Sequence, residues 1–120
     1  MTTAAHEHLD TVTLDQYCAA IGAATLLKSV VVFEQMAPEY VEAIAQGLES
    51  GDKDQVLSEA HKLKGAAGSV GLKRIQELSQ ALQCGDEPRW EGEHKAWFDA
   101  IRTHLDGDLT SLKAYLTERA

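Results

Sequence analysis

Residues 60–71 are the stretch AHKLKGAAGSVG, around which the rest of this 120-residue chain is organised. His61 is followed by a lysine after three residues and by glycines after four and seven, although a helix interior disfavours glycine by roughly 1 kcal/mol relative to alanine. At about 100° per residue, a helix here places His61 with Lys64, Gly65 and Gly68 on the flank of an apolar stripe. The pattern indicates an accessible, nucleophilic imidazole with a cation beside it.

Apolar residues recur at three- and four-residue steps through most of the chain, as is typical of amphipathic helices. They predict a short helix from Thr13, which Gly22 ends, and then helices over residues 23–49, 52–69, 72–83 and 89–118. Pro38 should kink the first of the long helices near Glu34. We predict an all-α fold, an antiparallel up-down-up-down four-helix bundle with a short additional N-terminal helix, over residues 13–120. The polar residues 1–12 are predicted to be a flexible tail.

Charge and composition narrow the class of protein. The net charge of −8 opposes binding to nucleic acid or to an anionic membrane surface. The chain has no apolar run near the ~20 residues that a membrane span needs, and it does not begin with a signal peptide. Cys18 and Cys84 lack any CxxC context and fit reduced thiols. The sequence therefore predicts a cytoplasmic protein, most simply a monomer, that binds neither nucleic acid nor membranes.

The reactive side chains of the sequence include a nucleophile and a neighbouring cation, but not the other groups of a complete catalytic site. A neutral imidazole near pH 7 can accept a phosphoryl group covalently, and a neighbouring cation such as Lys64 favours the transfer of that anionic group. The sequence has no GxxxxGK[ST] phosphate loop and no cluster of zinc ligands. A metal-binding bundle would need two Glu-x-x-His pairs, and only Glu91 and His94 form one, so no metal site is expected. The alternatives at this point are a carrier histidine completed by a partner and an ordinary solvated surface histidine.

The stretch AHKLKGAAGSVG also resembles the HxxKG signature of histidine-containing phosphotransfer (HPt) domains. The likeness continues through Leu72 and Gln83 and back through residues 29–41, and it covers roughly residues 14–118. It is greatest to the HPt domain that ends an anaerobic sensor kinase. The resemblance implies that His61 is phosphorylated, that Lys64 contacts the phosphoryl group and that Gln83 is a polar neighbour of the histidine. It also implies that Gly65 and Gly68 leave room for a partner's receiver domain.

The resemblance further implies a phosphotransfer protein of a two-component phosphorelay. His61 would accept a phosphoryl group from the receiver domain of a hybrid sensor kinase and pass it to the receiver of a response regulator. The chain would need no cofactor of its own, because the receiver supplies Mg²⁺, and it would have no ATP-dependent kinase activity. Leu57, with Phe33 or Met36, is a candidate for the apolar docking patch.

Two alternatives remain open. The chain could be a non-catalytic helical adaptor that binds receiver domains. It could also be a domain excised from a hybrid kinase, although the polar residues 1–12 favour a stand-alone protein.

Overall fold

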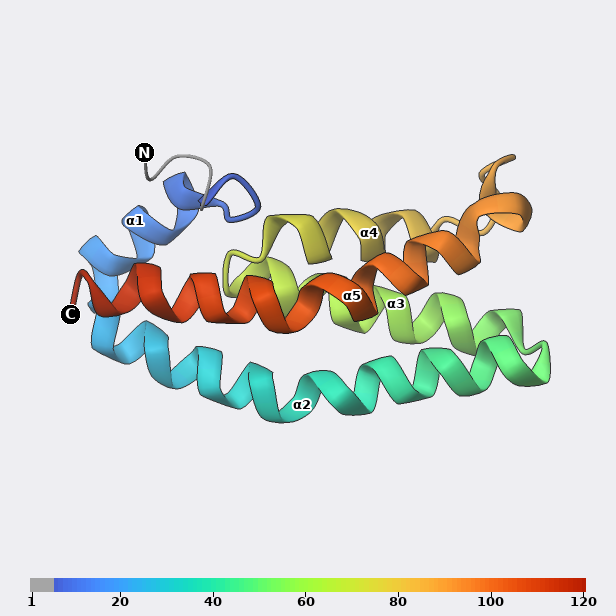
Figure 1. The fold of residues 1–120 in the computed structure, drawn as a ribbon, viewed down its shortest axis with the longest axis horizontal. Coiled ribbons are helices and arrows are strands. Elements are labelled where there is room, and N and C mark those ends of the chain that lie inside the picture. Colours follow the sequence, from blue (N-terminus) through green and yellow to red (C-terminus); the bar gives the residue numbers. More distant parts are fainter. Residues whose placement is uncertain (1–5) are drawn as a thin grey trace.

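The computed structural model describes residues 6–120, which form five α-helices joined by short connections (Figure 1). These helices are α1 (Thr11–Ile21), α2 (Ala23–Ser50), α3 (Lys53–Ser69), α4 (Lys73–Gln83) and α5 (Trp90–Thr117). Helices α2 to α5 run alternately up and down, each packed against the next, and α2 also packs against α5. The predicted four-helix bundle with a short additional N-terminal helix is therefore confirmed.

The connections follow from residues that end or cap helices. Gly22, Gly51 and Gly71 all have positive φ, a conformation that favours glycine, and each stands at a sharp change of chain direction. Asp52 caps α3 by accepting a hydrogen bond from the backbone N–H of Gln55 at 3.1 Å. Pro38 lies inside α2, which continues through it to Ser50 and shows only a shallow bow in Figure 1.

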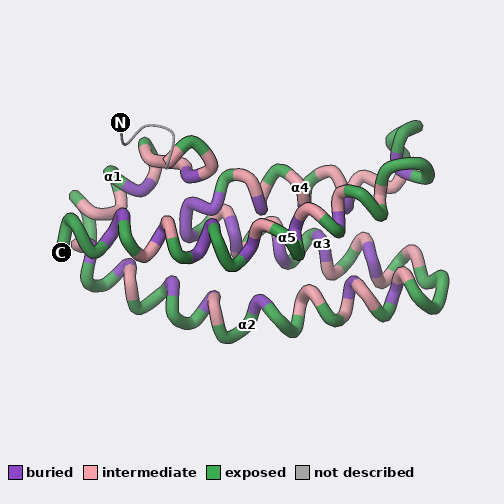
Figure 2. Tube along the Cα trace, in the orientation of Figure 1, coloured by how far each residue is buried: buried purple, intermediate pink, exposed green. Residues whose placement is uncertain are grey.

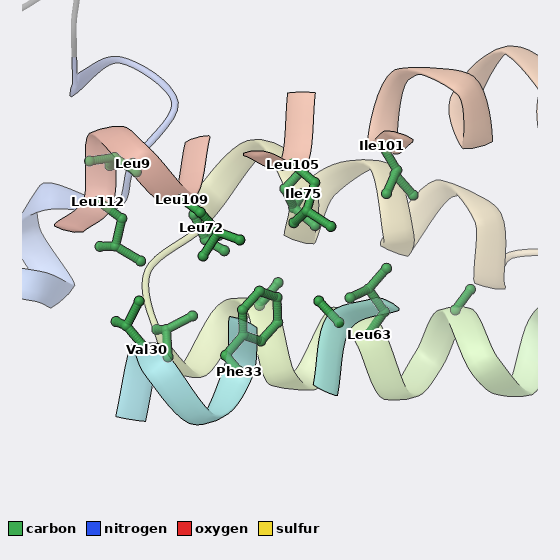
Figure 3. Close-up of a cluster of buried hydrophobic side chains, with 14 of the residues drawn as sticks. Leu9, Val30, Phe33, Leu63, Leu72, Ile75, Ile101, Leu105, Leu109 and Leu112 are labelled. Carbon is green, nitrogen blue, oxygen red and sulfur yellow. The ribbon is translucent and has the colours of Figure 1, made fainter. Parts of the chain in front are cut away.

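The core runs along the axis of the bundle. Purple segments in Figure 2 face inward from all five helices. Figure 3 shows side chains of α2, α3, α4 and α5 meeting in this core, with Leu9 from the segment before α1. The apolar stripe predicted for α3 is buried along its whole length, and it consists of Val56, Ala60, Leu63, Ala67 and Val70. Because this stripe faces inward, the opposite side of α3 is presented to solvent.

The prediction of a flexible tail over residues 1–12 is wrong for residues 6–12, and residues 1–5 lie outside the described part of the chain. Leu9 is buried in the core, and α1 already begins at Thr11. The backbone N–H of Asp10 donates to the carbonyl of Gly71 at 2.9 Å, and that of Arg74 donates to the carbonyl of His8 at 3.2 Å. One apolar side chain and two backbone hydrogen bonds thus fasten this polar segment to the turn between α3 and α4.

A partly buried ion pair joins α4 to α5. The Arg74 guanidinium donates two hydrogen bonds to the Asp108 carboxylate, at 3.0 and 2.6 Å, and the Asp108 side chain is only 6% exposed. Within residues 6–120, no single helix is long and apolar enough to cross a membrane. Helices α1 and α2 meet that criterion only as a pair, with a bend of 119° between them.

Candidate functional site

His61 lies at the middle of α3, on the side of that helix that is exposed to solvent. Its ring nitrogen Nδ1 is 3.2 Å from the amide oxygen Oε1 of Gln83, the last residue of α4. In this amide orientation Oε1 can only accept a hydrogen bond, so the contact requires the tautomer with the proton on Nδ1. The lone pair of Nε2 is then available to attack an electrophile.

The two lysines that follow His61 differ in their surroundings. Lys62 donates a hydrogen bond to Glu59 at 2.9 Å, and this hydrogen bond raises the pKa of Lys62. Lys64 is half-buried on the flank of α3 and has no hydrogen bond or ion pair with any other residue between 6 and 120. Since residues three apart are neighbours on a helix, Lys64 is the cation available to a group attached to His61.

The two glycines on this flank, Gly65 and Gly68, have different surroundings. A Cβ atom built on Gly65 would have no heavy atom within 4 Å apart from its chain neighbours and the backbone of its own helix, and this position is exposed to solvent. A Cβ atom on Gly68 would lie 2.7 Å from Nε2 of Gln76, which extends from α4. The expectation that both glycines leave room for a partner therefore needs correction at Gly68, where the space is filled by the chain's own Gln76.

The three residues considered for the docking patch differ in how exposed they are. Leu57 is half-buried, and its methyl groups approach Gly85 in the α4–α5 connection, so it contributes mainly to packing within the bundle. Phe33 is buried in the core and is only 4% exposed, because it points between the helices. Met36, by contrast, is 43% exposed on α2 and remains available to a partner.

An open, mainly apolar groove of about 290 Å³ lies between α2 and α3. Val32, Met36 and Tyr40 line it from α2 at four-residue spacing, and Ala66 and Ser69 line it from α3. Ala66 follows directly after the open Gly65, so the groove borders the side of α3 that carries His61. The groove was not predicted from the sequence, although apolar residues repeat every four positions along its α2 wall and such a repeat was a signal for it.

His94, the histidine considered for metal binding, makes contacts within the fold. The Nδ1 atom of His94 is 2.8 Å from the carbonyl oxygen of Trp90, and its ring stacks on the Trp90 ring at a centroid distance of 4.2 Å. No group of three or more His, Cys, Asp or Glu side chains in the described range, 6–120, has an arrangement that could hold a metal ion.

Comparison with known proteins places these residues in a family context. The Hpt domain family model matches residues 28–115, which include His61, Lys64 and Gln83. The aerobic respiration control sensor protein ArcB of Escherichia coli (strain K12) is 37% identical over 110 residues, and so is ArcB of Shigella flexneri. The matched region is 92% of this chain but only 14% of those sensor proteins.

Two solved structures have the same fold. The histidine-containing phosphotransfer domain of ArcB from Escherichia coli superimposes with a TM-score of 0.93 at 35% identity, over 98% of this chain and 99% of that domain. The solution structure of the histidine-containing phosphotransfer domain of ArcB, also from Escherichia coli, gives a TM-score of 0.87 at 35% identity. It covers 97% of this chain and 93% of that one.

Proposed function

This chain belongs to the Hpt domain family, and from that premise we propose that it is a phosphoryl carrier of a multistep two-component phosphorelay. We propose that His61 accepts a phosphoryl group from an aspartate in the receiver domain of a hybrid sensor kinase and passes it to an aspartate of a response regulator. The observation that carries the proposal is the hydrogen bond between Gln83 and His61, which leaves Nε2 as the nucleophile on an exposed helix face.

The transfer is a displacement at phosphorus. The Nε2 lone pair of His61 forms a bond to the phosphorus of the aspartyl phosphate, and the bond from phosphorus to the aspartate oxygen breaks, which releases a carboxylate. The proton stays on Nδ1, where Gln83 accepts a hydrogen bond from it. This proton keeps the phosphorylated ring cationic, which makes nitrogen a good leaving group for the second transfer.

The proposed roles of the neighbouring residues follow from their positions. Lys64, which has no other partner between residues 6 and 120, would stabilise the charge on the transferring phosphoryl oxygens. Gly65 would let the receiver approach the imidazole, because no side chain among residues 6–120, its two chain neighbours apart, lies within 4 Å of where its Cβ atom would be. We propose that the receiver supplies Mg²⁺ and an acidic pocket, so that this chain contributes the histidine and no ATP-dependent kinase activity of its own.

The groove between α2 and α3 is the proposed docking surface for an apolar patch on the receiver. Its α2 wall includes Val32 and Met36, which are 54% and 43% exposed. Large apolar side chains that are open to solvent next to a reactive group are typical of a protein–protein contact. We propose that this exchange takes place in the cytoplasm, the location predicted from the sequence.

The test is a phosphotransfer assay with an isolated receiver domain carrying a radiolabelled aspartyl phosphate. Wild-type protein is expected to acquire label that is lost in acid, because a phosphoramidate is acid-labile. His61→Gln should acquire none, whereas the control His104→Gln, on α5, should behave as wild type. Label on His61→Gln at the wild-type level would contradict the proposal, and tight receiver binding without any label on the wild type would indicate an adaptor.

A further inference from the structure

The end of α4 that carries Gln83 is held by a buried hydrogen bond from another helix. The indole N–H of Trp90, at the start of α5, donates to the carbonyl oxygen of Leu82 at 2.8 Å, and both residues are buried. The last carbonyls of a helix have no intrahelical partner, so a buried one must find a donor elsewhere. Trp90 supplies that donor to the residue directly before Gln83.

The Trp90 indole is itself held in place. The His94 ring stacks on it with an interplanar angle of 8°, and the Lys53 ammonium lies 4.6 Å from the ring centroid. Lys53 also donates a hydrogen bond to the carbonyl of Gly85 at 3.0 Å and forms an ion pair with Glu91 at 3.1 Å. The start of α3, the end of α4 and the start of α5 therefore meet at one anchored corner of the bundle.

We propose that Trp90 is a positioning residue for phosphotransfer, which acts through Leu82 to keep Gln83 beside His61. The indole N–H fixes the Leu82 carbonyl, and the fixed end of α4 presents the Gln83 amide oxygen to Nδ1 of His61. The proton then stays on Nδ1 and Nε2 remains free. The importance of this arrangement for transfer rests on the proposed function, but the arrangement can be measured without any transfer.

The experiment determines the tautomer of His61 by ¹⁵N NMR of the imidazole in the full, unphosphorylated chain. The wild type is expected to carry the proton mainly on Nδ1. Free imidazole side chains prefer the proton on Nε2, so Gln83→Ala should give that preference and serve as the reference for a released ring. Trp90→Phe keeps an aromatic ring but loses the N–H, and it should lower the Nδ1–H to Nε2–H ratio by about three- to tenfold, the range expected for loss of one hydrogen bond.

A matched control and a closer isostere distinguish the effect of losing the N–H group from the effect of a smaller side chain. Trp97 lies on the same helix and is half-buried, and its indole N–H has no partner among residues 6–120, so Trp97→Phe should leave the tautomer ratio unchanged. If Trp90→Phe does not fold, Trp90 can be replaced, in a Trp97→Phe background, by a tryptophan analogue in which sulfur takes the place of the indole N–H. This analogue should lower the ratio as Trp90→Phe would.

A folded Trp90 variant with the wild-type tautomer ratio would overturn the proposal, and so would a wild-type imidazole protonated on Nε2. Failure of the proposed function has a different signature. In that case the wild-type protein takes up no label from a phosphorylated receiver, whatever the tautomer measurement shows. Retention of the ratio in Trp97→Phe, together with its fall in both Trp90 variants, is the result expected.

Discussion

At the scale of single residues, Lys62 and Lys64 are two lysines on one helix whose ammonium groups differ in how freely they can move. The Lys62 ammonium is bound to Glu59, whereas that of Lys64 has no partner between residues 6 and 120. Freedom of this kind matters because a cation can stabilise a transferring phosphoryl group only if it can move to meet it. The difference can be tested with two variants of the same net charge, Lys62→Ala and Lys64→Ala.

Lys64→Ala is expected to lower the rate of phosphoryl transfer to His61 by about ten- to a hundredfold, because it removes the charge that stabilises the phosphoryl oxygens. Lys62→Ala, with the same change in net charge, should alter that rate by less than about twofold. Both rates are measured with one phosphorylated receiver under single-turnover conditions, and thermal melts check that both variants fold. Equal effects of the two substitutions would remove the role proposed for Lys64.

At the scale of elements, α3 meets α4 through Gly68 and meets solvent through Gly65. Both glycines weaken the helix, since each adds conformational freedom to the unfolded chain. Only Gly68 has a structural reason within the bundle, because the Gln76 side chain lies where its Cβ atom would be. Gly65 has no such contact among residues 6–120, which agrees with the clearance proposed for a partner at this position.

Gly65→Ala is expected to increase the free energy of unfolding by about 0.5–1 kcal/mol, the usual gain for this change in an exposed helix interior. Gly68→Ala should give a smaller gain, because Gln76 must first move away. Urea unfolding curves followed by circular dichroism measure both values. A bulkier change, Gly65→Leu, should keep the fold but slow transfer from the receiver, and an undiminished rate would contradict the clearance proposed at this position.

The elements also show how far the sequence could be used for prediction. Periodicity placed the helices to within about two residues, because the apolar stripes are continuous and glycines stand at the turns. The N-terminal segment was missed, since a single apolar residue, Leu9, among polar ones is no periodic signal, and two of its other attachments are backbone hydrogen bonds. Backbone hydrogen bonds between distant segments leave no trace in a residue pattern.

Only part of the candidate site could likewise be predicted from the sequence. His61 and Lys64 share one helix, so their proximity follows from spacing alone. Gln83 comes from a different helix, and only the resemblance to HPt domains pointed to it. The role of Gln76 beside Gly68 and that of Trp90 beside Leu82 depend on the register between helices, which the pattern of a single helix does not contain.

At the scale of the whole molecule, α1 and the end of α5 close the same end of the bundle. The Tyr115 hydroxyl donates to the Asp15 carboxylate at 2.5 Å, and Arg119 lies 3.3 Å from the same carboxylate. Burial, and next the hydrogen bond to Asp15, raise the pKa of Tyr115 to about 12. The neutral phenol is therefore part of what holds α1 in place.

This contact predicts a loss of stability in alkali. Because the folded pKa lies above the unfolded value of about 10, the contribution of Tyr115 is complete below about pH 10 and is lost as the pH rises towards about 12. Tyr115→Phe should be less stable than wild type at pH 8, and the difference should shrink between pH 10 and 12. Urea unfolding of both proteins across this range measures the difference, which isolates Tyr115 from lysines and cysteines that also ionise there. A constant difference would refute this account.

The closed end of the bundle has a consequence for how the domain could be joined to others. The C-terminus lies at this end with α1, in a molecule 44 Å long, whereas His61 lies at the middle of α3. A flexible tether of about 20 residues has a root-mean-square span of roughly 25 Å. A receiver fused to the C-terminus by such a tether would meet His61 at a millimolar effective concentration. It would outcompete free receivers at micromolar concentration, so tether length alone could decide which aspartate exchanges phosphate with this histidine.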